Sequence, residues 1–255
     1  MKFSLIAPTR ERTNGVNCLL NSIQNTASNL DDIEILFAVD EDDIATIQYF
    51  NTIQHQVLYP NLHISHHIRQ RTEFLNGDYY NWLASMAKGE FIWAVADDVV
   101  FLVQHWDKFI YETAQSYLVD KKDRIVCVGI KDSTPKPKTT LPQFPCFPMV
   151  SREALAFFGF ILHPQIPTWG ADYLLYLLYT GAHRYLEICN NVYLDHVSWH
   201  TRQAKEDKVA QRIRAIFGRL QHEPQFNVDI NAITVIPQQV AALRDYIKKV
   251  EIENV

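Results

Sequence analysis

Residues 89–101 read Gly-Glu-Phe-Ile-Trp-Ala-Val-Ala-Asp-Asp-Val-Val-Phe, an apolar run that ends in two adjacent carboxylates, Asp97 and Asp98. Six of the seven residues from 91 to 97 are apolar, which is typical of a strand covered on both faces. Charge at the end of such a strand has to be solvated by water, a metal or a ligand. Ligands of open α/β sheets bind beyond the carboxyl ends of the strands, and Mg²⁺ or Mn²⁺ prefers carboxylate oxygens. The stretch predicts a site for a metal-bound phosphate, although two acids in this place can also cap a turn.

The surrounding sequence alternates predicted strands and helices. Apolar runs predict strands over 3–7, 33–39, 62–64, 91–97, 124–130 and 185–194, and helical patterns begin near 16, 44, 79, 106 and 172. Pro8 is expected to end the first strand. This alternation favours right-handed crossovers and a parallel sheet. We therefore predict an α/β fold, with one Rossmann-like domain over 1–203 whose mainly parallel central sheet is flanked by helices, and a helical C-terminal tail over 204–255.

The composition fits one large globular domain and excludes several classes of protein. The chain has 255 residues, of which 47% are hydrophobic and 21% charged, so disorder is not expected. A formal net charge of -5 gives no electrostatic reason for unspecific nucleic-acid binding. The four cysteines show no CxxC spacing, so neither a zinc site nor a disulfide framework is expected. Because no apolar run is long enough for a membrane span or a signal peptide, we expect a cytoplasmic protein, with association at a membrane surface left open.

Four motifs, taken in order, resemble those of the nucleotide-sugar glycosyltransferases with the GT-A fold, closest to the family 2 type. They are Ala-Pro-Thr-Arg at 7–10, Ala-Val-Asp at 38–40, Ala-Lys-Gly-Glu at 87–90, and the strand that ends in the acids at 97 and 98. The resemblance covers about residues 3–200. It implies a GT-A-like domain with a donor half over about 1–101 and an acceptor half over about 102–203. It also implies a hexosyltransferase that uses Mn²⁺ or Mg²⁺ to move a sugar from a nucleotide-diphosphate donor to the hydroxyl of a glycan or another acceptor.

The resemblance also assigns residues to the donor. The nucleobase and the ribose would be held by Pro8, Thr9, Arg10 and Asp40. Asp98 would bind the metal, and Asp97 would contact a sugar hydroxyl or a metal-bound water. The motif here reads Ala-Asp-Asp at 96–98, so the first acid of the family's DxD motif is missing if the alignment ends on Asp98. Independently of the resemblance, Asp40 beyond a strand could accept hydrogen bonds from a uracil N3–H or from ribose hydroxyls, or it could belong to a solvated acidic turn.

Two further donor contacts are expected before and within the helix predicted over 79–87. Arg69 and Arg71 are placed in the preceding loop, where a cation could pair with the donor phosphates. Asn81 matches a polar helix residue that lines the donor pocket in similar enzymes. The alternatives are ordinary surface arginines and an exposed helix residue.

The acceptor side is expected at the Trp-Gly-Ala-Asp stretch over 169–172, which resembles a motif where an acid begins a helix. The family pattern usually has Glu-Asp there, and this chain keeps only the second acid. Asp172 is the predicted catalytic base, because a positioned carboxylate can take the proton of an attacking hydroxyl. It could also cap the helix. His196, and as second choice His200, are predicted metal ligands, since metal-dependent relatives use a histidine in this region; either could instead be a surface or packing residue.

Alternative functions share parts of this pattern. A nucleotidyltransferase uses similar strand-end acids, but it normally has a glycine-rich basic loop after the first strand, where this chain has a single glycine, Gly15. A catalytically inactive sugar-nucleotide-binding or scaffold module would carry the same acids as turn caps. Among transferases, Asp172 favours inversion at the anomeric carbon, and retention stays open.

Overall fold

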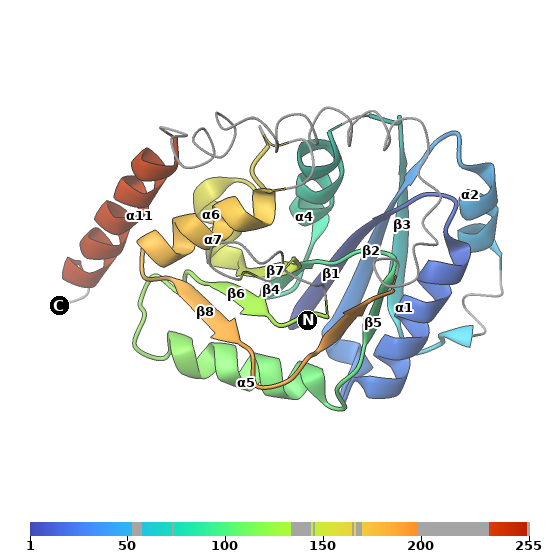
Figure 1. The fold of residues 1–255 in the computed structure, drawn as a ribbon, viewed down its shortest axis with the longest axis horizontal. Coiled ribbons are helices and arrows are strands. Elements are labelled where there is room, and N and C mark those ends of the chain that lie inside the picture. Colours follow the sequence, from blue (N-terminus) through green and yellow to red (C-terminus); the bar gives the residue numbers. More distant parts are fainter. Residues whose placement is uncertain are drawn as a thin grey trace.

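Helices lie on both sides of a central sheet, as Figure 1 shows, and strands alternate with helices from β1 to β4. The structure is a computed structural model that describes residues 1–52, 58–72, 74–133, 144, 146–164, 166, 170–197 and 235–253. In chain order the elements are β1 Phe3–Thr9, α1 Thr13–Thr26, η1 Leu30–Asp32, β2 Ile33–Asp40, α2 Ile44–Asn51, β3 His63–Arg69, η2 Leu75–Asn81, α4 Trp82–Met86, β4 Phe91–Ala94, β5 Val99–Phe101, α5 Trp106–Leu118, β6 Cys127–Ile130, β7 Pro148–Ser151, α6 Arg152–Phe158, α7 Ala171–Gly181, β8 Tyr185–Ile188, β9 Leu194–His196 and α11 Val235–Ile252.

Seven of these strands form one sheet in the order β3-β2-β1-β4-β7-β6-β8. The pairs β3–β2, β2–β1, β1–β4 and β6–β8 are parallel, whereas β7 runs antiparallel to its neighbours β4 and β6. Outside this sheet, β5 and β9 form an antiparallel pair. The predicted α/β fold with a mainly parallel central sheet is therefore confirmed.

The central strands bury both of their faces, because alternate side chains enter two different cores. Phe3 and Leu5 of β1 join a core with α1 and α5, whereas Ile6 joins a second core with α4, α6 and α7. The same alternation holds along β4, where Trp93 faces the first core and Ile92 the second. In Figure 1, α1 and α5 lie on one side of the sheet and α4, α6 and α7 on the other. These cores hold the carboxyl ends of β1, β2 and β4 rigidly beside one another.

The prediction that Pro8 ends the first strand is wrong. Its backbone nitrogen lies where the sheet needs no hydrogen-bond donor. β1 continues to Thr9, paired with β2. Ile6 directs its carbonyl at the N–H of Val95, so Pro8, two residues later, has its backbone nitrogen on the same side of the strand. The pairing of β1 with β4 stops at Ile6, and a missing N–H beyond that point breaks no ladder hydrogen bond.

Three other strand boundaries differ from the sequence prediction. The strand expected over 62–64 is the longer edge strand β3, whose half-exposed, histidine-rich sequence lacks the apolar run of a central strand. The run over 91–97 is a strand only to Ala94, and the acids follow in a turn. The strand expected over 185–194 is two short strands, β8 and β9, which belong to different sheets.

The described part of the predicted C-terminal tail is the helix α11, which packs against α7. Leu243 and Ile247 of α11 enter the second core, and Arg244 donates to the carbonyl of Gly181 at the end of α7. Pro237 lies in the first turn of α11, where a missing N–H costs no helical hydrogen bond. Within the described ranges, no helix combines the length and the apolarity needed to cross a membrane.

Candidate functional site

The two acids that follow β4, Asp97 and Asp98, form what we call the acid pair. Asp97 is buried, at 4% exposure, and the side chain of Asp98 is 11% exposed. The hydroxyl of Thr9 donates to Oδ2 of Asp97 at 2.7 Å. Nη1 of Arg12 donates to Oδ1 of Asp97 at 3.1 Å and to Oδ2 of Asp98 at 3.4 Å. The acid pair is thus tied to the carboxyl end of β1 by a hydroxyl and a guanidinium.

His196 reaches the acid pair because β5 pairs with β9. In this small sheet Val99 lies opposite His196, and the N–H of Val197 donates to the carbonyl of Asp98 at 3.0 Å. Nε2 of His196 lies 3.4 Å from Oδ1 of Asp98. The two predicted metal ligands, Asp98 and His196, are therefore far apart in the sequence but neighbours in the structure.

The spacing of these two atoms fits a shared divalent cation. Such a cation lies about 2.1 Å from each ligand atom, so two adjacent ligand atoms are about 3 Å apart. Oδ1 of Asp98 and Nε2 of His196, at 3.4 Å, are close to that spacing. The described ranges contain no group of three or more His, Cys, Asp or Glu side chains arranged for a metal. A cation held here would take its remaining ligands from water or donor phosphates, as Mg²⁺ commonly does.

Burial makes the ionised form of Asp97 costly. It raises the pKa of Asp97 from its ordinary value of 3.8 to about 6; Arg12 acts in the opposite direction, and the neighbouring charge of Asp98 adds to the rise. Tyr80 packs beside the acid pair with its hydroxyl donating to the carbonyl of Val95 at 2.8 Å, and burial raises the pKa of that hydroxyl well above its ordinary value. A carboxylate in such surroundings gains from an additional positive charge.

A second group of charged residues, which we call the Asp40 cluster, follows β2. It consists of Asp40, Arg10, Asp42, Arg71 and Tyr79. Asp40 is 5% exposed; its Oδ1 accepts a hydrogen bond from the Tyr79 hydroxyl, and its Oδ2 accepts one from Nη1 of Arg10 at 3.0 Å. Nε of Arg71 lies 3.8 Å from the same Oδ2. Hydrogen bonds from Arg10 hold the pKa of Asp42 below its ordinary value.

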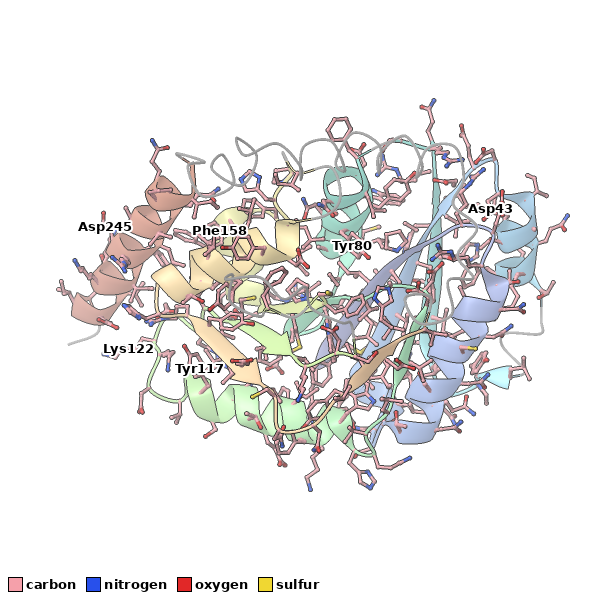
Figure 2. The ribbon with its side chains drawn as sticks, in the orientation of Figure 1. Asp43, Tyr80, Tyr117, Lys122, Phe158 and Asp245 are labelled. Atoms are coloured by element: carbon pink, nitrogen blue, oxygen red, sulfur yellow. The ribbon has the colours of Figure 1, made fainter. Side chains whose placement is uncertain are left out.

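One short loop supplies arginines to both groups. Glu11 takes the left-handed conformation, with φ of 54°, and its N–H donates to Oδ2 of Asp43 at 2.7 Å. Because of this turn, the side chain of Arg10 contacts the Asp40 cluster and the side chain of Arg12 contacts the acid pair. Figure 2 labels Asp43 at the start of α2 and Tyr80 near the centre of the molecule. Gly15 allows α1 to approach the acid pair closely, because a Cβ at this position would lie 2.7 Å from the backbone oxygen of Asp97.

The sequence predicted Arg69 in a loop, but Arg69 is the last residue of β3. Its guanidinium lies 4.9 Å from the ring centre of Tyr79 and 5.1 Å from that of Trp82. Arg71 does lie in the loop, beside Asp40. Arg69 therefore contacts the Asp40 cluster by packing on the ring of Tyr79. A contact of Arg69 with donor phosphates stays a prediction.

Asn81, the last residue of η2, uses its amide group to hold a neighbouring loop. Its Oδ1 accepts from the backbone N–H groups of residues 161 and 162, at 2.9 and 3.0 Å, and its Nδ2 donates to the carbonyl of Leu162 at 2.7 Å. The side chain is half-buried rather than exposed. A donor contact of Asn81 stays a prediction, and these hydrogen bonds support a bracing role instead.

Asp172 lies in the first turn of α7, as the sequence predicted. Gly170 before it has φ of 91°, a left-handed conformation that favours glycine and turns the chain into the helix. Oδ1 of Asp172 accepts from the N–H of Tyr173 at 2.9 Å. The acid therefore sits at the positive end of the helix dipole, where its charge is stabilised.

Two phenylalanines contact aromatic rings near the two halves of the candidate site, one at the start of α7 and one beside the acid pair. The ring of Phe144 lies 5.0 Å from that of Tyr173, and the ring of Phe147 lies 5.1 Å from that of His196. The carbonyl of Phe147 accepts from the indole N–H of Trp93 in β4, which fixes this segment on the sheet. His200, the second-choice ligand, lies outside the described residues.

The sequence interpretation missed the roles of Arg12 and Tyr79. Arg12 does carry a signal: it is the N-cap residue of α1, where a small polar or acidic side chain is preferred and a cation is opposed by the helix dipole. Tyr79 gives no such signal, because its pattern in the sequence is that of an apolar helix residue.

The fold of this chain is similar to that of several solved structures. No family model matches the chain, and no curated protein does. The solved structures of S. aureus TarS 1-349 align with 100% of this chain and 89% of theirs, with a TM-score of 0.58 and 16% identity for one of them. Another of these structures is in complex with UDP. The mannosyltransferase PcManGT from Pyrobaculum calidifontis, in complex with GDP-Man and Mn²⁺, aligns over 98% of this chain and 73% of its own, with a TM-score of 0.61 and 15% identity. The chain therefore has the GT-A-like fold of nucleotide-sugar glycosyltransferases.

Proposed function

We propose that this protein is a glycosyltransferase of the hexosyltransferase type, which moves a sugar from a nucleotide-diphosphate donor to an acceptor hydroxyl with inversion. The observation that carries the proposal is that Nε2 of His196 lies 3.4 Å from Oδ1 of Asp98, which follows β4 at the carboxyl end of the sheet. Strand-end positions of this kind are where α/β sheets bind nucleotides. Neighbours of the same fold with UDP or with GDP-Man and Mn²⁺ support the choice of donor class.

The Asp40 cluster is the proposed site for the nucleoside. The carboxylate of Asp40 is held in place by Tyr79 and Arg10, and it could accept hydrogen bonds from a nucleobase N–H or a ribose hydroxyl. Pro8 and Thr9 bring the end of β1 alongside the last residues of β2. Arg71, and Arg69 beyond it, offer guanidinium groups to the phosphates that would follow.

The acid pair and His196 are the proposed diphosphate side of the site. A divalent cation, Mn²⁺ or Mg²⁺, would be held by Oδ1 of Asp98 and Nε2 of His196, and it would neutralise the charge that develops on the leaving diphosphate. Asp97 is anchored by Thr9 and Arg12 and would fix a sugar hydroxyl or a bound water. Phe147 packs edge-on against the ring of His196 and holds its orientation.

Asp172 is the proposed base. Its place in the first turn of α7 lets the helix dipole stabilise a negative charge on the carboxylate, and a base uses that charge to take the proton of the acceptor hydroxyl. A carboxylate on the acceptor side, separate from the donor-binding acids, favours direct displacement and hence inversion. The acceptor would be a glycan or another hydroxyl-bearing molecule.

The test compares Asp98→Asn and Asp172→Asn with the wild type. With UDP- and GDP-sugars and Mn²⁺, we expect Asp98→Asn to lower donor turnover by at least about a hundredfold and to abolish the Mn²⁺-dependent part of nucleotide binding in calorimetry. Asp172→Asn should keep that binding but lose about a hundredfold or more in transfer. The exposed acid Asp120 supplies a matched control, Asp120→Asn, which should change neither quantity.

The outcomes separate the alternatives. Unchanged Mn²⁺-dependent turnover in Asp98→Asn would refute the metal role of the acid pair. Binding of donors without any turnover, in the wild type and in all variants, would identify an inactive sugar-nucleotide-binding module. NMR of the product anomer tests inversion on its own, because a retained configuration contradicts the role of Asp172 as base.

A further inference from the structure

Arg12 places one nitrogen between the two carboxylates of the acid pair. Nη1 lies 3.1 Å from Oδ1 of Asp97 and 3.4 Å from Oδ2 of Asp98, whereas Oδ1 of Asp98 faces His196. The guanidinium and a cation bound by Asp98 and His196 would therefore lie on different oxygens of the same carboxylate. Both charges would act on one small, largely buried site, where electrostatic interactions are weakly screened.

Helix stability does not explain an arginine at this position. Arg12 is the N-cap of α1, its side chain makes no capping hydrogen bond, and the first turn of the helix contains no acidic residue. A cation there is opposed by the positive end of the helix dipole. The loop nevertheless directs the side chain at the acid pair, through the left-handed turn at Glu11 that Asp43 holds. In the described part of the chain, Arg12 donates hydrogen bonds to both carboxylates of the acid pair.

We propose that Arg12 is a resident cation of the acid pair, which weakens the binding of a free divalent ion and makes metal binding depend on the donor diphosphate. This inference rests on the proposed function. When the site is without donor, the guanidinium supplies positive charge to Asp97 and Asp98, and a divalent ion beside it is repelled. The diphosphate brings several negative charges, which can be shared between the ion and the guanidinium. The ion and the donor should consequently bind together, with strong coupling between them.

The experiment measures Mn²⁺ binding rather than turnover. Mn²⁺ is titrated into the wild type, Arg12→Met and Arg12→Lys, alone and with saturating UDP or GDP, and the free ion is followed by electron paramagnetic resonance. Arg12→Met keeps an unbranched apolar stem but removes the guanidinium and its charge, and the Arg12 side chain is 38% exposed, so the fold should tolerate the change. Lys108→Met removes one positive charge from an exposed position on α5 and serves as the matched control.

We expect Arg12→Met to bind free Mn²⁺ about tenfold more tightly than the wild type and to lose about tenfold of the coupling between Mn²⁺ and nucleotide. Arg12→Lys and Lys108→Met should stay within about twofold of the wild type for free Mn²⁺, because the first keeps the local charge and the second changes an exposed charge that solvent screens. A merely structural role for Arg12 predicts the opposite sign, since a misplaced acid pair would bind Mn²⁺ more weakly.

Two contrary results have different meanings. If the wild type binds Mn²⁺ with nucleotide and Arg12→Met binds free Mn²⁺ no more tightly than the wild type does, the inference is wrong and the proposed function stands. If the wild type binds nucleotide but no Mn²⁺ under either condition, the inference and the metal part of the proposed function are both overturned. Circular dichroism of each variant verifies that the comparison is between folded proteins.

Discussion

The two acidic groups at the carboxyl end of the sheet are buried alike but compensated differently. Asp40 and Asp97 are 5% and 4% exposed. Asp40 accepts hydrogen bonds from a phenol and from a guanidinium, with Arg71 nearby, whereas Asp97 accepts from Thr9 and from a guanidinium that also serves the adjacent Asp98. Burial and the second carboxylate raise the pKa of Asp97 to about 6. The difference suggests a division of labour, in which the Asp40 cluster orients a neutral ligand and the acid pair attracts a positive one.

The largest expected effect that tests this comparison is on stability, with Asp97→Asn. The pKa of Asp97 is higher in the folded state than its ordinary value of 3.8, so this group favours folding most below about pH 4 and loses about 3 kcal/mol of that contribution as the pH rises through 6. Asparagine is neutral throughout. In metal-free buffer, urea unfolding should find the variant more stable than the wild type at pH 8 and similar to it near pH 4.

Asp40→Asn is the matched variant in the other cluster. It weakens a charged hydrogen bond between Asp40 and Arg10 inside the protein, so it should lower the free energy of unfolding at pH 8 by about 1–3 kcal/mol. The comparison fails if Asp97→Asn is destabilised at pH 8 to the same extent as Asp40→Asn. If the free energy of unfolding at pH 8 rises in Asp97→Asn and falls in Asp40→Asn, the ionised form of Asp97 destabilises the folded protein.

A smaller effect is expected for Gly15→Ala, which tests how closely α1 must approach the acid pair. The new Cβ would lie 2.7 Å from the backbone oxygen of Asp97, so the helix or the turn after β4 has to move, at a cost of about 2 kcal/mol. Because Arg12 is the N-cap residue of the same helix, Mn²⁺-dependent binding of UDP or GDP should fall as well. In Gly77→Ala, the nearest atom is 3.6 Å away, so stability and binding should both be kept. Equal behaviour of the two alanine variants would contradict this account.

The sequence was a good guide to the buried part of the sheet because apolar runs mark strands that are covered on both faces. It predicted β1, β2, β4 and β6 in this way, and with them the strand ends where acids collect. It underestimated β3, since an edge strand with alternating exposure carries no continuous apolar signal. It also could not divide 185–194 between two sheets, because pairing partners depend on the whole fold and not on the local pattern.

For the site, position in the sequence predicted which strand ends matter, but not which side chains meet there. Asp40 is the last residue of β2, and Asp97 and Asp98 lie in the turn shortly after β4, so the carboxyl-end rule brings them into one region. Arg12 and Tyr79 reach the acids across loops and helix faces, and their contacts depend on long side chains whose direction the spacing does not define. An arginine at a helix N-cap is the kind of local misfit that could have drawn attention to Arg12.

The smallest expected effect comes from Tyr79→Phe, which removes the phenol oxygen from the Asp40 cluster. That oxygen donates to Oδ1 of Asp40 and accepts from the N–H of Thr72, so its loss should cost about 1 kcal/mol of folding stability. If the cluster orients the nucleoside, UDP or GDP affinity without metal should fall severalfold. Tyr49→Phe removes a comparable hydrogen bond, from Tyr49 to Asn17 at 2.8 Å, and should cost similar stability with no change in nucleotide affinity. Equal nucleotide affinity in the two variants would mean that Asp40 does not depend on Tyr79 for its role, and it would place the nucleoside elsewhere along the strand ends.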